Sequence, residues 1–219
     1  MNRLQRILTG FAAILVLFTA GCHRSETSYW ENGVKKSELS YRGKRMEGVA
    51  TWWYANGNKQ MEAEYHNNQL EGRSTRWFYN GEVESITHYS GGLRNGPSIT
   101  YTETGSKVAE EHYLNDTLHG PYTTWFPGGG MCISGHFDHG WYDSTWIYYD
   151  ETGIRVGEGR FRKGTGVQVG FYPSGRVIRE IPYVDNRKHG EEKWFDEQGN
   201  LTTVLVYEND RLIRQSMGE

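Results

Sequence analysis

The sequence has little of what builds an ordinary globular core. Only 36% of its 219 residues are hydrophobic, so we do not expect a thick apolar interior. Its two cysteines cannot form a disulfide framework. Five prolines beside 28 glycines indicate many tight turns rather than a disordered chain. The net charge is −3 and there is no run of Lys or Arg, so we expect no nucleic-acid partner.

A glycine that follows turn-forming residues recurs at nearly constant spacing. Seven intervals separate eight such glycines; six are 24 residues long and one is 22. The glycines are Gly33, Gly57, Gly81, Gly105, Gly129, Gly153, Gly175 and Gly199. Periods of roughly 20–50 residues are typical of elongated arrays in which each unit contacts only its neighbours. The sequence therefore predicts eight tandem repeats.

Two aromatic positions share this period. The position four residues before each glycine holds Tyr29, Trp53, Trp77, Tyr101, Trp125, Tyr149, Phe171 and Phe195. The position eight residues after each glycine holds Tyr41, Tyr65, Tyr89, Tyr113, Phe137, Phe161, Tyr183 and Tyr207. Only 14% of the residues are aromatic, so agreement at every place indicates a repeated role. We interpret both columns as structural, because a one-layer sheet has little else to bury.

Each repeat has the pattern of a β-hairpin followed by a second hairpin connection. Residues 49–54 and 58–65 are rich in β-branched and aromatic types and flank the turn at Gly57. Pro127 and Pro173 precede their glycines by two residues, which predicts a three-residue loop closed by a left-handed glycine. The expected fold is all-β: one elongated, twisted antiparallel sheet of about eight tandem hairpin repeats and about sixteen strands.

The lengths of the two turns predict which residues share a face. A three-residue loop places Trp53 and Tyr65 on the same face, so both aromatic columns should line one face and leave the other polar. The second turns, such as Asn67-Asn68, have two residues and would reverse the faces in every repeat. Bulges that restore the register are therefore expected at Gly48, Gly72, Gly96, Gly120, Gly166 and Gly190, with Ser144 as the exception. The short repeat should lack two residues of this second turn, between Phe161 and Gly166.

Residues 1–21 have the pattern of a secretory signal peptide. Arg3 and Arg6 precede an apolar run over residues 7–20, which is too short for a comfortable membrane-spanning helix. Ala20-Gly21-Cys22 resembles the lipobox of bacterial lipoproteins, although Thr19 stands where that family usually has Leu. The resemblance implies that Cys22 is lipidated, with palmitate among the acyl groups, and His23 implies the outer membrane. A plain signal peptide, or a membrane anchor with an unmodified cysteine, is the alternative.

The repeat unit is similar to the variant MORN repeat of bacteria. The resemblance rests on Trp53-Tyr54-Ala55-Asn56-Gly57, on Tyr65 and on Leu70-Glu71-Gly72, and it implies a long twisted antiparallel sheet. Related bacterial proteins are often labelled as YwqK-type antitoxins, whereas MORN arrays elsewhere resemble scaffolds. The chain then divides into a signal peptide (1–21), lipidated Cys22 with a short tether (22–26), a repeat array (27–213) and a tail (214–219).

The sequence contains no motif for catalysis or for binding a cofactor. We therefore expect no enzyme activity, no catalytic residue, no cofactor and no metal site. His88, His112 and His136 recur every 24 residues, but equivalent strands lie about 9–10 Å apart, too far to share one zinc ion. Further histidines lie in or beside turns and are expected to be solvated; they are His66, His119, His139 and His189.

Three aromatic residues fall outside both columns and form the candidate binding surface. Trp52, Tyr148 and Trp194 are expected on the opposite face, where exposed aromatic side chains suit a protein or a glycan. We expect a non-enzymatic envelope lipoprotein, held at the membrane by its lipid anchor, that acts as a protein-binding or scaffold module. An immunity or antitoxin-like protein and a cell-wall glycan binder are the alternatives.

Overall fold

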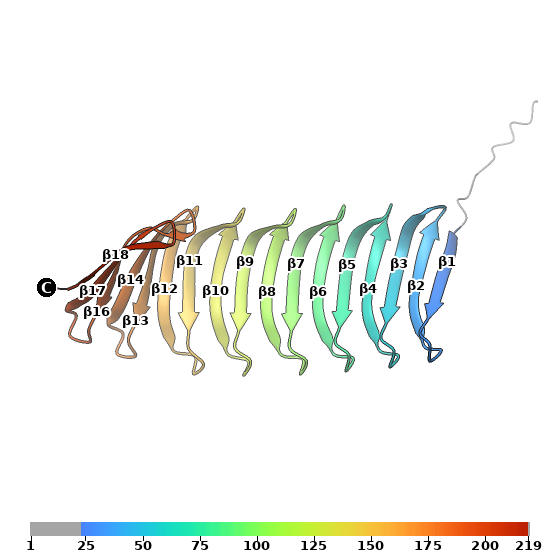
Figure 1. Ribbon diagram of the computed structural model, residues 1–219, viewed down its shortest axis with the longest axis horizontal. Helices are drawn as coiled ribbons and strands as arrows, with labels where there is room; N and C mark the ends of the chain where they lie inside the picture. The colour runs from blue at the N-terminus through green and yellow to red at the C-terminus, as the bar shows by residue number, and fades with distance from the viewer. Residues whose placement is uncertain (1–22, 219) are drawn as a thin grey trace, which may run out of the picture.

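The computed structural model describes residues 23–218, which form eighteen strands and no helix. The strands are β1 (His23–Tyr29), β2 (Lys35–Arg42), β3 (Arg45–Trp53), β4 (Lys59–His66), β5 (Gln69–Trp77), β6 (Val83–Ser90), β7 (Leu93–Tyr101), β8 (Lys107–Leu114), β9 (Thr117–Trp125), β10 (Met131–Asp138), β11 (Trp141–Tyr149), β12 (Arg155–Arg162), β13 (Thr165–Phe171), β14 (Val177–Val184), β15 (Arg187–Lys188), β16 (Gly190–Phe195), β17 (Leu201–Glu208) and β18 (Arg211–Met217). Successive strands pair in antiparallel fashion, except that β15 and β16 both pair with β14, so the chain forms one open sheet of successive hairpins (Figure 1). The expected all-β architecture is confirmed.

The array is longer than the sequence predicts. The expected tether is strand from His23 onward, and the expected tail is strand as far as Met217, so both boundaries were wrong. The strand count exceeds sixteen because β18 follows the last repeat and because β15 and β16 are separate strands. The predicted signal peptide and Cys22 lie outside the described residues. Within residues 23–218, no helix is long and apolar enough to cross a membrane.

The first turn of each repeat has the predicted geometry. The Tyr54 N–H donates to the Asn58 carbonyl at 2.9 Å, and the Gly57 N–H donates to the Tyr54 carbonyl at 3.0 Å. Gly57 has a φ of +92°, the left-handed conformation that glycine adopts without steric cost. The same pair of bonds recurs at all eight turn glycines. The three-residue loop inferred from Pro127 is therefore confirmed.

A bulge that the sequence analysis missed follows each of these turns. Trp53 pairs with Lys59, but the preceding Trp52 pairs with Met61, so Gln60 has no partner across the ladder. The equivalent unpaired residues, three after each turn glycine, are Lys36, Gln60, Glu84, Val108, Cys132, Val156, Ile178 and Thr202. One extra residue exchanges the two faces for every residue beyond it.

The two aromatic columns consequently lie on opposite faces, and the prediction that they share one face was wrong. In the β3–β4 ladder Tyr65 pairs with Gly48, four residues from Trp52, so Trp52 and Tyr65 share a face. Their rings meet edge to face, with centroids 6.4 Å apart. Trp53 points to the other side of the sheet. We call the two sides the Tyr65 face and the Trp53 face.

The second turns confirm the expected bulges in every repeat but one. Tyr65 pairs with Leu70. Two residues earlier, Ala63 pairs with Ser74, so three residues centred on Gly72 lie opposite one residue of β4. Gly72 has a φ of +71°. The same left-handed position is occupied by Gly48, Gly96, Gly120, Ser144 and Gly190.

The short repeat lacks this bulge rather than part of its turn. Lys163 and Gly164 form a complete two-residue turn with φ values of 49° and 75°. β12 and β13 then pair without a register shift, and Gly166 does not have a positive φ. The expected bulge at Gly166 was therefore wrong. Because two residues are missing, the faces are preserved on both sides of the deletion.

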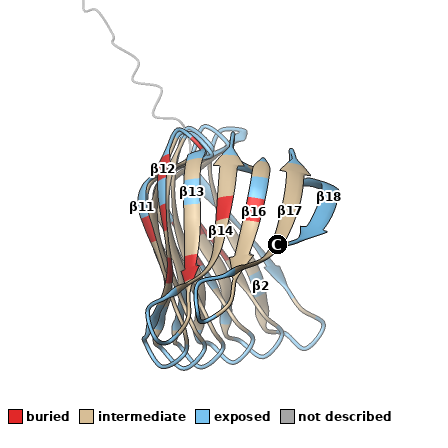
Figure 2. Ribbon diagram, turned by 90° about the vertical axis from the view of Figure 1, so that its left-hand side faces the viewer, coloured by how far each residue is buried: buried red, intermediate tan, exposed pale blue. Residues whose placement is uncertain are grey.

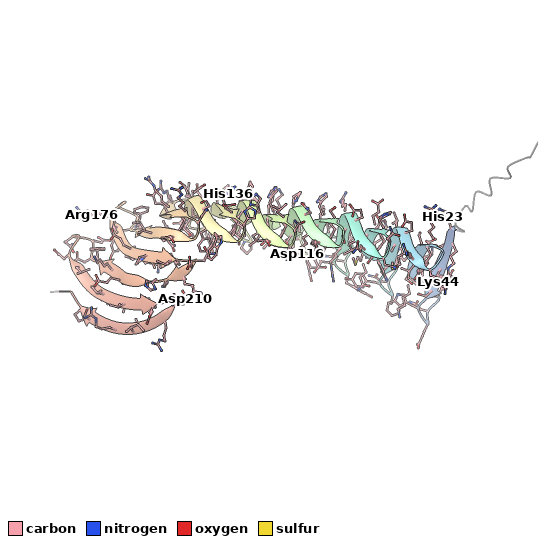
Figure 3. All side chains as sticks on the ribbon, turned by 90° about the horizontal axis from the view of Figure 1, so that it is seen from above. His23, Lys44, Asp116, His136, Arg176 and Asp210 are labelled. Carbon is pink, nitrogen blue, oxygen red and sulfur yellow. The ribbon has the colours of Figure 1, made fainter. Side chains whose placement is uncertain are left out.

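The sheet is straight along its first two thirds and then turns. Figure 3 shows the strands up to about β12 along one axis, whereas β13 to β18 stack in a new direction. The change follows the one second turn that lacks its bulge. Bulges increase the local twist and bend of a strand. We therefore attribute the change of direction to the missing bulge.

The largest packed cluster lies on the Tyr65 face, just before the sheet turns. Phe137, Trp146 and Phe161 are buried there, and Figure 2 shows buried residues on β11 and β12. The Trp146 ring lies over Gly135, where an added Cβ would come within 2.2 Å of it. A similar Cβ at Gly159 would meet Phe161 at 2.3 Å. These glycines provide the room for the aromatic rings.

Candidate binding surface on the Trp53 face

The Trp53 face carries a repeated group of three side chains, which we call a rung. In the second repeat the Lys59 ammonium bonds the Glu62 carboxylate at 2.5 Å. The same ammonium lies 5.4 Å from the centre of the Trp77 ring on the next strand. Lys59 follows the turn glycine by two residues and Glu62 by five. The first turn and its bulge therefore place the cation between the acid and the ring.

Four rungs of this kind occur along the sheet, in the first, second, fourth and sixth hairpins. They are Lys35/Glu38/Trp53, Lys59/Glu62/Trp77, Lys107/Glu110/Trp125 and Arg155/Glu158/Phe171. Each tryptophan of the first aromatic column lies beside a lysine. Where Val83 or Met131 replaces the cation, the ring of the next strand is Tyr101 or Tyr149. Among aromatic rings, indole attracts a cation most strongly, which accounts for a tryptophan beside each of these lysines and a tyrosine where the cation is missing.

The ion pairs order the rungs more than they stabilise the fold. The hydrogen bond with Glu38 raises the pKa of Lys35 above its ordinary value, and the same bond lowers the pKa of Glu38. The hydrogen bond with Glu110 raises the pKa of Lys107 in the same way. Such exposed pairs contribute little to the stability of the fold, because solvent screens the two charges. Their main consequence is to hold charged groups and half-buried rings in fixed places.

A hollow opens on this face beside the second rung. Its lining residues are Val49, Glu62, Ala63, Glu64, Arg73, Thr75 and Trp77. Thr75 is buried on the same face, and Val49 at the rim is 51% exposed. The hollow thus offers an aromatic wall, an apolar rim, two carboxylates and a guanidinium. This combination can bind the mixed apolar and charged side chains of a protein surface.

The predicted site residues do not lie where the sequence analysis placed them. Trp52, Tyr148 and Trp194 were expected opposite both columns, but they share the Tyr65 face with the second column. The cause is the missed bulge after each first turn. Tyr148 packs against the buried aromatic cluster, and burial raises the pKa of its hydroxyl. Arg179 covers Trp194, with its guanidinium 5.3 Å from the ring centre. A binding role for these three residues stays a prediction.

A third set of contacts, not predicted from the sequence, is made by Trp30, Tyr54 and Tyr172, each three residues before a turn glycine. The Tyr54 hydroxyl donates to the Trp77 carbonyl at 2.9 Å, and the Tyr172 hydroxyl donates to the Phe195 carbonyl at 2.9 Å. Each bond joins one hairpin to the next. An aromatic residue at this position in five of eight copies was the available signal; the five are Trp30, Tyr54, Phe78, Phe126 and Tyr172.

Copies without that aromatic residue cap their own turn. The Asp150 carboxylate accepts hydrogen bonds from the Thr152 hydroxyl at 2.7 Å and from the Ile154 N–H at 3.0 Å. Asp196 accepts from two turn N–H groups in the same way. The Thr102 hydroxyl accepts from the Ser106 N–H at 3.1 Å. Polar residues here are therefore alternative turn caps.

The fold and this surface define a β-hairpin repeat protein, and the comparison with known families agrees. The model of the MORN repeat variant family matches residues 25–42, 46–67, 165–185 and 188–209. These segments cover hairpins at both ends of the sheet, and the strands between them continue the same unit. The chain thus contains MORN repeats at these segments. MORN repeats are found in binding and scaffold proteins and are generally non-catalytic modules. A search of curated proteins found no match to this chain.

Proposed function

We propose that the protein is a lipid-anchored lipoprotein of the bacterial envelope that acts as a protein-binding scaffold. The partner binds on the Trp53 face, over the rungs between β2 and β9. The observation that carries this proposal is the set of ordered, half-exposed rungs, which recur in the first, second and fourth hairpins of this stretch. A flat, one-layer sheet with fixed aromatic and charged groups suits a large protein surface better than a small substrate.

The sequence before the sheet supports the anchor. Arg3 and Arg6, the apolar run over residues 7–20 and the small residues before Cys22 form the lipoprotein pattern. Strand β1 starts at His23, so a lipidated Cys22 holds the first hairpin close to the membrane surface. The outer membrane is proposed because His23, not Asp, follows the cysteine.

The anchor is tested by replacing Cys22. In the Cys22→Ala chain we expect loss of metabolic labelling with palmitate and loss of the protein from the membrane fraction. Cys132→Ala is the matched control and should keep both. Labelling of the Cys22→Ala chain equal to that of the wild type would show that Cys22 is not the acylated residue.

Binding is tested by crosslinking the full-length protein in its native envelope and identifying captured proteins by mass spectrometry. Replacing Trp53 by Ala should reduce capture of the main partner at least fivefold. Trp52→Ala is the matched control, because the neighbouring ring lies on the other face. A partner that is a toxin would specify the immunity alternative. Capture of glycan strands alone, or equal losses in both variants, would contradict the proposal.

A further inference from the structure

A cluster of two imidazoles and one carboxylate lies at the second turn between β10 and β11. His139 Nδ1 is 2.7 Å from Asp138 Oδ1, and His119 Nδ1, from β9, is 3.4 Å from the same oxygen. The rings of His119 and His139 lie with their centroids 4.5 Å apart. One ligand atom from each residue lies within 4.8 Å of the others. The three residues come from two adjacent hairpins.

This corner differs from the equivalent corners of the array. The residue at the position of His119 is Glu47, Glu71, Asn95, Asp143 or His189 elsewhere, and the residues at the positions of Asp138 and His139 are then His66-Asn67, Ser90-Gly91, Leu114-Asn115, Arg162-Lys163 or Glu208-Asn209. Glu47, Glu71 and Asp143 accept the backbone N–H of the next turn, which satisfies that donor. His119 Nδ1 accepts the His139 N–H at 3.3 Å instead. Since a carboxylate accepts this N–H group at those corners, the need to satisfy that donor does not explain why two imidazoles lie here.

A third histidine beside the cluster is also unusual. His88 Nδ1 and His112 Nδ1 lie 3.0 Å and 3.1 Å from the carbonyls of Pro97 and Pro121. The equivalent atom of His136 is buried and has no hydrogen-bond partner. The His136 ring meets His119 edge to face at 6.4 Å between centroids. The imidazole rings of His119, His136 and His139 therefore lie together at this one place in the described array.

We propose that His119, Asp138 and His139 form a binding site for a divalent transition-metal ion such as Zn²⁺. Zinc takes imidazole nitrogen and carboxylate oxygen at about 2.0–2.2 Å, so its tetrahedral ligands lie about 3.3–3.5 Å from one another. The 3.4 Å distance from His119 Nδ1 to Asp138 Oδ1 matches that spacing. The 2.7 Å distance from His139 Nδ1 to the same oxygen is a hydrogen-bond distance, which must lengthen as the metal replaces the hydrogen bonds at both Nδ1 atoms. Two imidazoles and one carboxylate without a thiolate suit zinc, copper or nickel.

The proposed site is open on its outer side. His139 is 63% exposed as a side chain, so water completes the coordination of the metal there. The metal bridges two hairpins, because His119 belongs to one and the turn to the next. The positive charge of Lys163 at the adjacent turn already interacts with the Asp138 carboxylate and repels a metal cation. We therefore expect modest affinity for the metal. From the sequence we expected no metal site, and we expected His119 and His139 to be solvated.

The test is a calorimetric titration of Zn²⁺ into the full-length protein, held in mild detergent and freed of metal with a chelator. We expect one zinc ion per chain. His139→Asn should weaken binding at least tenfold, because it removes one imidazole ligand. The substitution suits the turn: Asn67 and Asn115 occupy the same position with φ values of 51° and 50°, and His139 has 48°. Circular dichroism confirms the fold of the variant.

The matched control is His66→Ser, which removes the imidazole from the corresponding corner beside Glu47. Its zinc affinity should equal that of the wild type. Asp138→Ser, with the residue found at Ser90, is the second test and should also weaken binding at least tenfold. Co²⁺ supplies an independent readout, since its absorption spectrum reports imidazole ligands directly. Absence of a 1:1 complex, or equal effects of His66→Ser and His139→Asn, would overturn the proposal.

Discussion

At the scale of single residues, cations lie over rings of both aromatic columns. In the Trp53 column a carboxylate holds a lysine beside Trp53, Trp77 and Trp125. In the Tyr65 column cations lie over Tyr41, Tyr113 and Tyr207, and the rings become buried only at Phe137 and Phe161. The Trp53 column is distinguished by its repeated Lys/Glu/Trp spacing, whereas the Tyr65 column leads into a packed aromatic cluster.

The packing of Trp146 over Gly135 leads to a stability prediction. Gly135→Ala should lower the free energy of unfolding by about 1–3 kcal/mol, because the new Cβ overlaps the indole and forces it out of the cluster. Gly128→Ala is the matched control, since nothing lies within 4 Å of its Cβ position. Thermal or urea unfolding measures both. Equal stabilities would show that Trp146 does not need the glycine.

The turn cap at Asp150 leads to a pH prediction. Its hydrogen bonds, from the Thr152 hydroxyl first, lower the pKa of the carboxyl below the ordinary 3.8. A carboxyl whose pKa is lower in the folded state than in the unfolded state stabilises the fold at pH values above its unfolded-state pKa. That contribution disappears as the pH falls through the folded-state pKa. The stability difference between wild type and Asp150→Asn should therefore shrink between pH 7 and pH 3, as measured by urea unfolding. A constant difference would contradict the assignment.

At the scale of elements, turns and bulges decide which residues meet. The first turns could be predicted, because Pro127 and Pro173 restrict the backbone and the glycine is constant. The bulge three residues later could not, because Gln60, Glu84 and Cys132 share no chemical type. A bulge depends on how two strands pair, not on one residue type. Because this bulge was not predicted, both aromatic columns were expected on one face.

The candidate binding surface could be predicted from the sequence only in part. Lys59, Glu62 and Trp77 recur at fixed distances from the turn glycines, so the rung residues could have been found by spacing. Their meeting on one face required the register of β4 and β5. The cluster at His139 was harder still, since His119 comes from another hairpin.

The left-handed conformation of the turn glycine leads to a prediction about the stability of the fold. Gly57→Ala should destabilise the fold by about 1–2 kcal/mol, because a Cβ is unfavourable at a φ of +92°. Gly57→Asn should cost less, since asparagine tolerates this conformation better. The nearest side-chain atom to the Cβ position is 4.0 Å away, so strain rather than overlap is measured. Urea unfolding of both variants compares them; equal losses would argue against backbone strain as the cause.

At the scale of the whole molecule, one missing bulge sets the shape. The sheet turns after β12, where the second turn pairs regularly (Figure 3). Inserting Arg-Asn between Thr165 and Gly166, as in Arg94-Asn95-Gly96, restores the period of 24 residues. We expect a straighter sheet and a larger maximum dimension in small-angle X-ray scattering. An unchanged maximum dimension would assign the turn to another cause.

The central claim is that a protein partner binds the Trp53 face, and two exposed arginines of β5 test it most directly. Arg73 lies on the Trp53 face beside the hollow, and Arg76 lies on the Tyr65 face of the same strand. A photoreactive amino acid is placed at one or the other in the full-length chain, and the native envelope is irradiated. The account predicts a discrete protein adduct from position 73 and little from position 76. Adducts of equal yield from both positions, or from position 76 alone, would contradict it.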